Sequence, residues 1–448
     1  MNNKFFKRTI SAFISAFLII SNSAVFAETN DIFVLPSDCI SKSDENKDTR
    51  IIIELEDSPL LSYSEKINTY SNVSDFLSSK EAKEIEQRLE QDRKAVKKSL
   101  VQSGMDFTVK REYSTIMNGL AVEANIADLE AIKQTDGVKE AFVAEFYSLP
   151  EPIDTYSSGG VSAIGGDIAG DLGFTGKNSA VAILDTGLDL SHPAFSSVNS
   201  PKYSKEDIES VIKNNKMTIG KLNVSKVYIN DKIPYAYDYA DVDTNVSGGE
   251  SHGTHVAGIV GANSGGVVEG VAPDAQLFIM KVFGDSSGGA YDDDILAALD
   301  DSVKFGVDVI NMSLGSTAGF SESAYKSMRE VYNRVKNSGI ALYCAAGNEY
   351  SSTYENAAGN DLPKATEPDN GVVASPSTYE AALSVASMNN IETTSIYLLA
   401  NGRKIRYNDP AEKESDRLIS LSGTFEYVDC GIGAATDFSG KNLKGKIA

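Results

Sequence analysis

The stretch "AVAILDTGLD", residues 180–189, has the pattern of a buried β-strand that ends in a carboxylate. Five small or apolar residues precede Asp185, and Thr186 and Gly187 follow it as a tight turn. A strand without polar alternation is typical of a parallel sheet covered on both faces. In open α/β sheets the ligand crevice lies at the carboxyl ends of the strands, so Asp185 is a candidate site residue. Its carboxylate could equally cap the turn.

The sequence on both sides of this strand alternates apolar strands with helices. Further strands are expected at 276–283, 307–314, 340–346 and 382–387, and helices at 256–261, 293–305 and 321–336. Alternation of this kind predicts an α/β domain with a parallel sheet and helices on both faces, over residues 159–390.

A different pattern occupies residues 49–148. Strands are expected at 50–56, 116–124 and 138–146, with a one-faced apolar helix at 80–103 and a short helix that stops at Gly137. The β-α-β-β-α-β order suggests a small α+β sandwich of the ferredoxin-like type. Residues 149–158 are rich in Pro, Gly and Ser and are expected to form a linker.

The N-terminus has the pattern of an export signal. Basic residues precede an apolar run at 10–20, and small residues lead to Ala27, so residues 1–27 are predicted to be a signal peptide. The alternative is a short membrane anchor, although the run is shorter than a membrane-spanning helix. Residues 28–48 are polar and expected to be flexible. No later stretch is apolar enough for a transmembrane segment.

Composition excludes several classes of protein. The 448 residues carry a formal net charge of −22, which argues against a nucleic-acid partner. The hydrophobic content of 42% is ordinary for a globular protein. The three cysteines are too few and too widely spaced for a disulfide scaffold or a zinc ribbon.

Two of the three histidines stand in "ESHGTHVAGIVGA", residues 250–262. His252 begins a helix, and a neutral imidazole is a good general base when an acid fixes its tautomer. His255 lies one turn deeper and is expected to be packed and hydrogen-bonded, and His192 to be structural. A zinc-protease helix needs two histidines four residues apart with Glu after the first. Here the spacing is three and Gly253 follows, so no metal site is predicted.

A third element is "CAAGN", residues 344–348, at the end of an expected buried strand. The side-chain amide of Asn348 could donate a hydrogen bond to a developing oxyanion. The alternative is an Asn in a polar loop.

Together, in this order on alternating strands and helices, these segments resemble those of the subtilisin-like serine proteases, peptidase family S8. "AVAILDTGLDLSHPAF" resembles the family's aspartate segment, "HGTHVAGIVGA…GVAPDAQL" its histidine segment and "CAAGN" its oxyanion segment. "INMSLGS", residues 310–316, resembles the strand that pairs with substrate backbone. The resemblance implies catalytic roles for Asp185, His252 and Asn348, and substrate binding by Ser313, Leu314, Gly315, Ala346 and Gly347.

The resemblance extends to the flanking regions. Residues 49–148 resemble the family's inhibitor propeptide, which assists folding and is cut away. Residues 391–448 resemble the start of the protease-associated insert of cell-envelope subtilases from Gram-positive bacteria. It therefore implies a secreted or cell-wall-associated endopeptidase, with protein or peptide substrates and its own propeptide as partners. Calcium is a common structural ion in the family, but the loop after the histidine helix is short of carboxylates, so no site is assigned.

One element of the family pattern is missing. The sequence has no Gly-Thr-Ser-Met-Ala-type segment, and "SGTFEY", residues 422–427, does not replace it. We therefore expect the catalytic domain to be incomplete, with the nucleophilic serine beyond residue 448 and this chain inactive by itself. The alternative is a naturally shortened, non-catalytic subtilase that binds peptides or inhibits a sister protease.

Overall fold

The computed structural model describes twelve stretches of the chain. They are residues 47–149, 156–158, 160–248, 250–265, 268–316, 326–348, 372–388, 392–394, 397–400, 402–406, 424–430 and 435–446. The expected signal peptide and nearly all of the expected flexible segment lie outside them. The chain divides into two units, one made of Met1–Pro150 with Ala169–Ser387 and the other of Glu151–Ile168 with Met388–Ala448.

The first unit contains a six-stranded parallel sheet in the order β13-β12-β11-β7-β9-β8. Its strands are β7 (Ala180–Asp185), β8 (Tyr235–Asp238), β9 (Gln276–Lys281), β11 (Val309–Met312), β12 (Ala341–Ala345) and β13 (Leu383–Val385). The predicted parallel sheet is therefore confirmed, with β8 as a strand that the sequence did not indicate.

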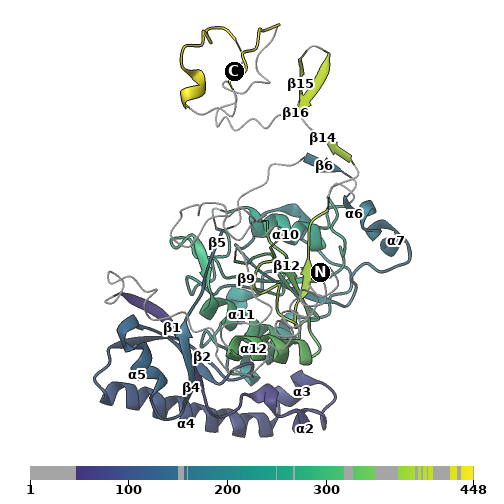
Figure 1. Ribbon diagram of the computed structural model, residues 1–448. Helices are drawn as coiled ribbons and strands as arrows, with labels where there is room; N and C mark the ends of the chain where they lie inside the picture. The colour runs from purple at the N-terminus through teal and green to yellow at the C-terminus, as the bar shows by residue number, and fades with distance from the viewer. Residues whose placement is uncertain are drawn as a thin grey trace, which may run out of the picture. The chain divides into compact units, whose positions relative to one another are not determined.

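Helices cover both faces of this sheet, as predicted (Figure 1). They are α10 (His252–Gly261), α11 (Asp292–Phe305) and α12 (Lys326–Asn337). Alternate residues of β7 point to opposite faces, because side chains alternate along a strand. Val181 and Ile183 share a core with Ala257 of α10. Ala182 and Leu184 share another core with the residues of α11 and α12.

The N-terminal part of this unit is a four-stranded antiparallel sheet in the order β2-β3-β1-β4. Its elements are β1 (Asp48–Leu55), α4 (Lys80–Gln102), β2 (Phe107–Tyr113), β3 (Gly119–Asn125), η3 (Ile126–Asp128), α5 (Leu129–Lys133) and β4 (Val138–Val143). The order β-α-β-β-α-β is that of the predicted ferredoxin-like sandwich. The sequence pattern did not locate β2.

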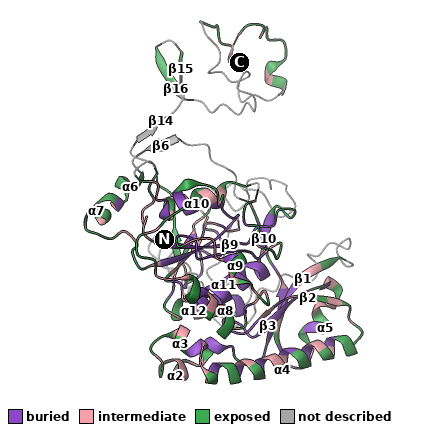
Figure 2. Ribbon diagram, turned by 180° about the vertical axis from the view of Figure 1, so that it is seen from behind, coloured by how far each residue is buried: buried purple, intermediate pink, exposed green. Residues whose placement is uncertain are grey.

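The two faces of this N-terminal sheet pack against different partners. Ile51 and Ile53 of β1 face a core that contains Val96 and Leu100 of α4. Ile52, which points the other way, belongs to the same core as α11 and α12. The helix α11 is buried along its whole length, as its purple ribbon in Figure 2 shows, because the N-terminal sheet covers it.

A short strand pair also joins the two parts of the first unit. β5 (Phe146–Ser148) pairs antiparallel with β10 (Gly289–Tyr291), which leads into α11. Smaller elements of this unit are η2 (Leu60–Ser62), α2 (Ser64–Ile67), α3 (Val73–Leu77), η4 (Pro193–Phe195), α8 (Lys205–Asn214) and α9 (Val224–Val227).

The second unit is built from short elements. β6 (Tyr156–Ser158), at the end of the expected linker, pairs antiparallel with β14 (Glu392–Thr394). The others are α6 (Gly160–Ala163), β15 (Tyr397–Ala400), β16 (Arg403–Arg406) and η7 (Ala435–Phe438), while α7 (Gly166–Asp171) crosses the boundary between the units. Within the described part of the chain, no helix is long and apolar enough to cross a membrane.

Candidate active site

Asp185 ends β7 with its side chain fully buried. Its Oδ1 accepts a hydrogen bond from the backbone N–H of Thr186 at 2.7 Å. Its Oδ2 is buried and has no hydrogen-bond partner among the described residues. A buried carboxylate held by its own turn is a rigid acceptor at the carboxyl edge of the sheet, where ligand sites of α/β folds lie.

His252, the first residue of α10, is that carboxylate's partner. Its Nδ1 lies 2.7 Å from Asp185 Oδ1, and its side chain is 29% exposed. Since an ionised carboxylate can only accept, Nδ1 carries the hydrogen and Nε2 is left with a free lone pair. The hydrogen bond to Asp185 raises the pKa of His252 above its usual 6.5 and outweighs burial, which acts in the opposite direction. The imidazole is therefore oriented and polarised as a general base requires.

Two glycines allow the helix to approach Asp185 closely. A Cβ added to Gly253 would lie 2.3 Å from the carbonyl oxygen of Gly187, so only glycine fits at this contact. Gly187 has φ +112°, and a Cβ there would lie 2.1 Å from the carbonyl oxygen of Val246. The backbone N–H of Gly253 also donates to Thr186 Oγ1 at 2.8 Å, which ties the start of α10 to the turn after Asp185.

The predicted oxyanion segment follows β12 in the sheet. Asn348 is exposed and stands at the same edge of the sheet as Asp185, because β12 and β7 run parallel with one strand between them. Ala346 is held by its backbone, which donates to Val385 O at 2.8 Å and accepts from Ala374 N at 2.9 Å. Gly347 has φ +102°, a conformation that favours glycine. This turn presents the Asn348 side chain to solvent.

The predicted substrate-binding segment follows β11 at the same edge. The side chain of Leu314 is buried in the core, so this residue can offer a substrate only its backbone. Ser313 is partly buried and its Oγ accepts from Asn311 Nδ2 at 3.0 Å. A Cβ on Gly315 would lie 2.7 Å from the Cβ of Ala374, which explains the glycine.

The structure agrees with the prediction for one of the other two histidines and disagrees with the prediction for the other. His192 is structural, as expected: its Nδ1 accepts from Ala194 N at 3.3 Å, and its ring packs on Phe195. The prediction for His255 was wrong, because this residue is exposed. It lies on the same side of α10 as Ile259, four residues on, which is 56% exposed.

An ionic cluster that the sequence did not indicate lies beside the Asp185–His252 pair. Lys281, the last residue of β9, pairs in register with Asp185 and is almost completely buried. Its Nζ contacts carboxylates of Asp238, Asp241 and Asp285. These carboxylates could hold a metal by their spacing, but the ammonium occupies the position between them, so the group does not fit a calcium site. The only signal in the sequence was a lysine that ends an apolar strand.

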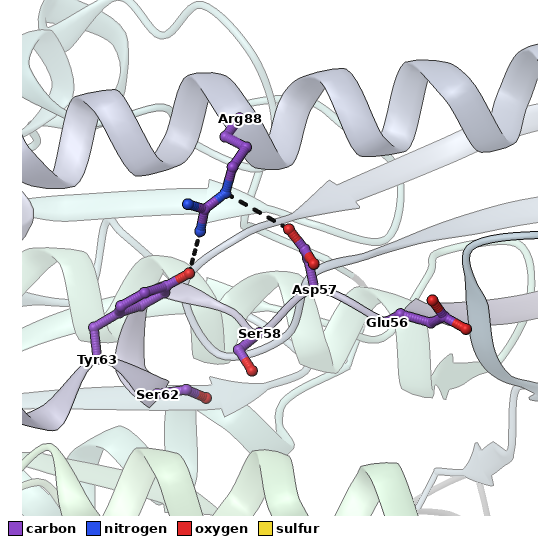
Figure 3. A pocket seen from close by; sticks show the side chains of 6 residues that line it. All are labelled: Glu56, Asp57, Ser58, Ser62, Tyr63 and Arg88. Carbon is purple, nitrogen blue, oxygen red and sulfur yellow. Dashed lines mark hydrogen bonds and ion pairs between the residues drawn. The ribbon is translucent and has the colours of Figure 1, made fainter.

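A polar hollow lies in the N-terminal domain, residues 49–148, and is lined by neither Asp185 nor His252. It is lined by Glu56, Asp57, Ser58, Ser62, Tyr63 and Arg88 (Figure 3). Arg88 contacts the hydroxyl of Tyr63 and lies 3.6 Å from Asp57, and both charged side chains are about half exposed. These contacts are internal to the domain.

An aspartate that ends a central strand of a parallel sheet is thus hydrogen-bonded to the histidine that begins α10, which is the arrangement expected from the resemblance to the subtilisin-like family. The sequence profile of the subtilase family matches residues 176–444, and the chain belongs to that family.

Among its curated relatives is the PII-type proteinase of Lactococcus lactis subsp. cremoris, 31% identical over 364 residues, covering 78% of this chain and 18% of that protein. The C5a peptidase of Streptococcus pyogenes is 30% identical over 286 residues, covering 61% of this chain and 23% of its own length. The minor extracellular protease Vpr of Bacillus subtilis (strain 168) is 27% identical over 419 residues, covering 90% and 44%. The chain thus spans less than half of the length of each of these relatives.

Proposed function

We propose that the protein is an exported serine endopeptidase that hydrolyses peptide bonds through an Asp-His-Ser triad. The observation that carries the proposal is the 2.7 Å contact between His252 Nδ1 and Asp185 Oδ1 at the carboxyl edge of a parallel sheet. Membership of the subtilase family and the names of its relatives, which are proteinases and peptidases, support the reaction class.

Each residue has a role set by its position. Asp185 keeps the Nδ1–H tautomer of His252 and stabilises the imidazolium that forms when Nε2 takes a proton. Asn348 donates its side-chain amide to the oxyanion of the tetrahedral intermediate. The backbone of Ser313–Gly315 and of Ala346–Gly347 binds the substrate as an added strand. The carboxylates around Lys281 do not serve as a calcium site in this proposal, because the lysine ammonium pairs with all three.

The nucleophile of the triad is a serine, and residues 1–448 contain no family-type segment that would provide it. This part of the proposal rests on the absence of a Gly-Thr-Ser-Met-Ala-type segment from the sequence. Without that hydroxyl, His252 has no group to deprotonate, and the 448 residues do not hydrolyse peptides by themselves.

The N-terminal domain acts as the enzyme's own inhibitor and is removed on maturation. Support comes from the strand β5, which lies antiparallel on β10 in the manner of a bound peptide. The carboxylate of Asp300, buried in α11, accepts backbone N–H groups of Thr115 at 3.0 Å and Ile116 at 2.8 Å. The exported protein would lose residues 1–27 first and this domain afterwards. N-terminal sequencing of the protein from the culture medium or cell wall tests both steps.

The test of the reaction uses the complete reading frame that encodes this chain. Hydrolysis of a fluorogenic peptide is measured for the wild type and for His252→Ala, with His192→Ala as the control. In subtilisin, loss of the histidine lowers kcat by about 10⁶, and we expect a loss of that order. His192→Ala should retain activity because its ring only caps a short turn. Equal activity of wild type and His252→Ala, or no hydrolysis by the complete frame, would exclude the proposed function.

A further inference from the structure

We infer that Lys281 is a positioning residue for the Asp185–His252 pair. Its side chain holds the turn at Gly187 and the loop at Gly248 in place, and these two segments position the catalytic histidine. The inference rests on the proposed function, since it concerns the same site. It assigns to a buried lysine a role that the family resemblance does not supply.

The ammonium of Lys281 joins its own strand, β9, to the turn at the end of β8 and to the loop that leads to β10. It lies 2.5 Å from Asp238 Oδ2 at the end of β8, 3.3 Å from Asp241 Oδ2 in the following loop and 2.9 Å from Asp285 Oδ1 in the loop that leads to β10. The backbone N–H of Asp285 also donates to Asp241 Oδ2 at 2.8 Å. The three carboxylates and the one ammonium therefore close a single network.

The aliphatic part of the same side chain supports two glycines. A Cβ on Gly187, in the turn after Asp185, would lie 3.1 Å from Lys281 Cδ. A Cβ on Gly248, in the loop before His252, would lie 3.2 Å from Lys281 Cε and 3.0 Å from Asp285 Oδ1. Both turns thus lie in close contact with the side chain of this lysine.

These turns determine where the histidine sits. The peptide of Gly187 is in close contact with Gly253, the residue after His252. The backbone N–H of Leu188 donates to Val246 O at 2.8 Å, so the two turns are also bonded to each other. Asp185 is connected to the lysine strand by the bond from Val282 N to Asp185 O, 3.0 Å long. Displacing Lys281 would therefore move the Gly187 turn, which contacts Gly253 at the start of α10, relative to Asp185.

Burial alone would argue for a purely structural salt bridge, which commonly contributes little net stability. The cluster around Lys281 differs from a purely structural salt bridge in its location, because it contacts the turns beside Asp185 and His252. Lys304 of α11 forms a comparable buried cluster, with Asp300 at 2.7 Å and Asp301 at 2.9 Å. Lys304 has no contact of this kind with the glycines beside the pair, so it provides a matched control.

The test is a titration of the three histidines by NMR in the full chain labelled at histidine. In the wild type the pKa of His252 should be above 6.5 and a downfield Nδ1–H signal should be present, owing to the bond to Asp185. The variant Asp185→Asn shows the pKa of His252 and the Nδ1–H signal when the Asp185 carboxylate is absent. We expect Lys281→Ala to lower the pKa of His252 toward the Asp185→Asn value and to weaken the downfield signal. His192, whose ring packs on Phe195 and whose Nδ1 accepts from Ala194 N, is the internal reference.

The sign of the change separates positioning from simple charge. Removing a positive charge stabilises a nearby imidazolium and so raises its pKa, whereas loss of the bond to Asp185 lowers it. A fall therefore supports positioning, while a rise or no change in folded Lys281→Ala overturns it. Lys304→Ala should lower the melting temperature without changing the titration of His252. An equal fall in Lys304→Ala would also overturn the inference.

A second variant covers the case in which Lys281→Ala does not fold because Asp238 is left buried and unpaired. The double variant Lys281→Met/Asp238→Asn keeps the side-chain volumes and removes the buried charges. It should lower the pKa of His252 in the same direction, and an unchanged value in this folded variant counts against the inference. The titration needs no hydrolysis, so its failure is distinguishable from failure of the proposed protease activity.

Discussion

Gly187, in the turn after Asp185, contacts the start of α10 and so bears on the geometry of the Asp185–His252 pair. Its φ of +112° and the 2.1 Å approach of a would-be Cβ to Val246 O each exclude a side chain. Gly173 also has a positive φ, +90°, but nothing lies within 4 Å of a Cβ added there. A substitution at Gly173 therefore measures the free-energy cost of the strained backbone alone.

We expect Gly187→Ala to destabilise the protein by more than Gly173→Ala. The strained backbone costs about 1–3 kcal/mol in both variants, and Gly187→Ala adds displacement of the Val246 carbonyl. Urea unfolding measures the difference, and the His252 titration shows whether the pair has moved. Equal destabilisation by the two substitutions would mean that the turn accommodates the methyl group.

At this scale the sequence predicted the pair but not its surroundings. Asp185 and His252 were recognisable because each stands in a long motif of small residues. The prediction for His255 was wrong because apolar residues on both sides of it in the sequence do not show which face of the helix packs against the sheet. Lys281 was overlooked because lysine is rarely buried, and its place is explained by three carboxylates, two of which, Asp238 and Asp241, come from a distant part of the sequence.

Among the elements, α11 has an unusual start, with three consecutive aspartates that are all buried. Asp292 accepts from Glu145 N at 2.9 Å and from the hydroxyl of Tyr147 at 2.9 Å. Burial, with the charge of Glu145, raises the pKa of Asp292 from 3.8 to about 7. The folded state therefore retains a proton that the unfolded chain releases.

The sign of the pH dependence follows from this raised pKa. The folded state binds more protons between pH 4 and 7, so the contribution of Asp292 to stability falls as the pH rises through that interval. At about 1.4 kcal/mol per pKa unit, the effect is of order 4 kcal/mol. Asp292→Asn should therefore flatten the decline in melting temperature between pH 4 and pH 7. The exposed Asp106→Asn is the control, and an identical decline in wild type and Asp292→Asn would contradict the assignment.

The elements that the sequence predicted are those with local signals. β7, β9 and α11 have continuous apolar runs or a helical period, and the structure has them close to the expected bounds. β10 has three residues, includes Gly289 and exists because β5, far away in the sequence, pairs with it. β2 contains three consecutive charged residues, Lys110, Arg111 and Glu112, and is held in the sheet by its pairing with β3. Neither a pairing with a distant segment nor a charged strand leaves an apolar period in the sequence.

For the whole molecule, the decisive contact is the one between the N-terminal sheet and α11. Arg111 of β2 contacts Asp294 at 2.6 Å and also reaches the carbonyl of Tyr239, while Arg50 of β1 contacts Asp293 at 3.0 Å. Arg111 and the two aspartates are buried. Charge-assisted contacts of this kind fix which surfaces meet, so they make the N-terminal domain specific for its own α11.

Removing one of these arginines should loosen the docking of the whole domain. Arg111→Ala leaves Asp294 buried with only Arg50 as its partner, and loss of a buried ionic partner costs about 3 kcal/mol. Arg88→Ala is the matched control, because Arg88 is half exposed and contacts only groups of its own domain (Figure 3). Its loss should cost no more than about 1 kcal/mol. Hydrogen exchange should therefore rise along α11 in Arg111→Ala and not in Arg88→Ala. If the two variants exchange alike, the domain is held by its apolar contacts with α11 and α12, and the charges contribute only specificity.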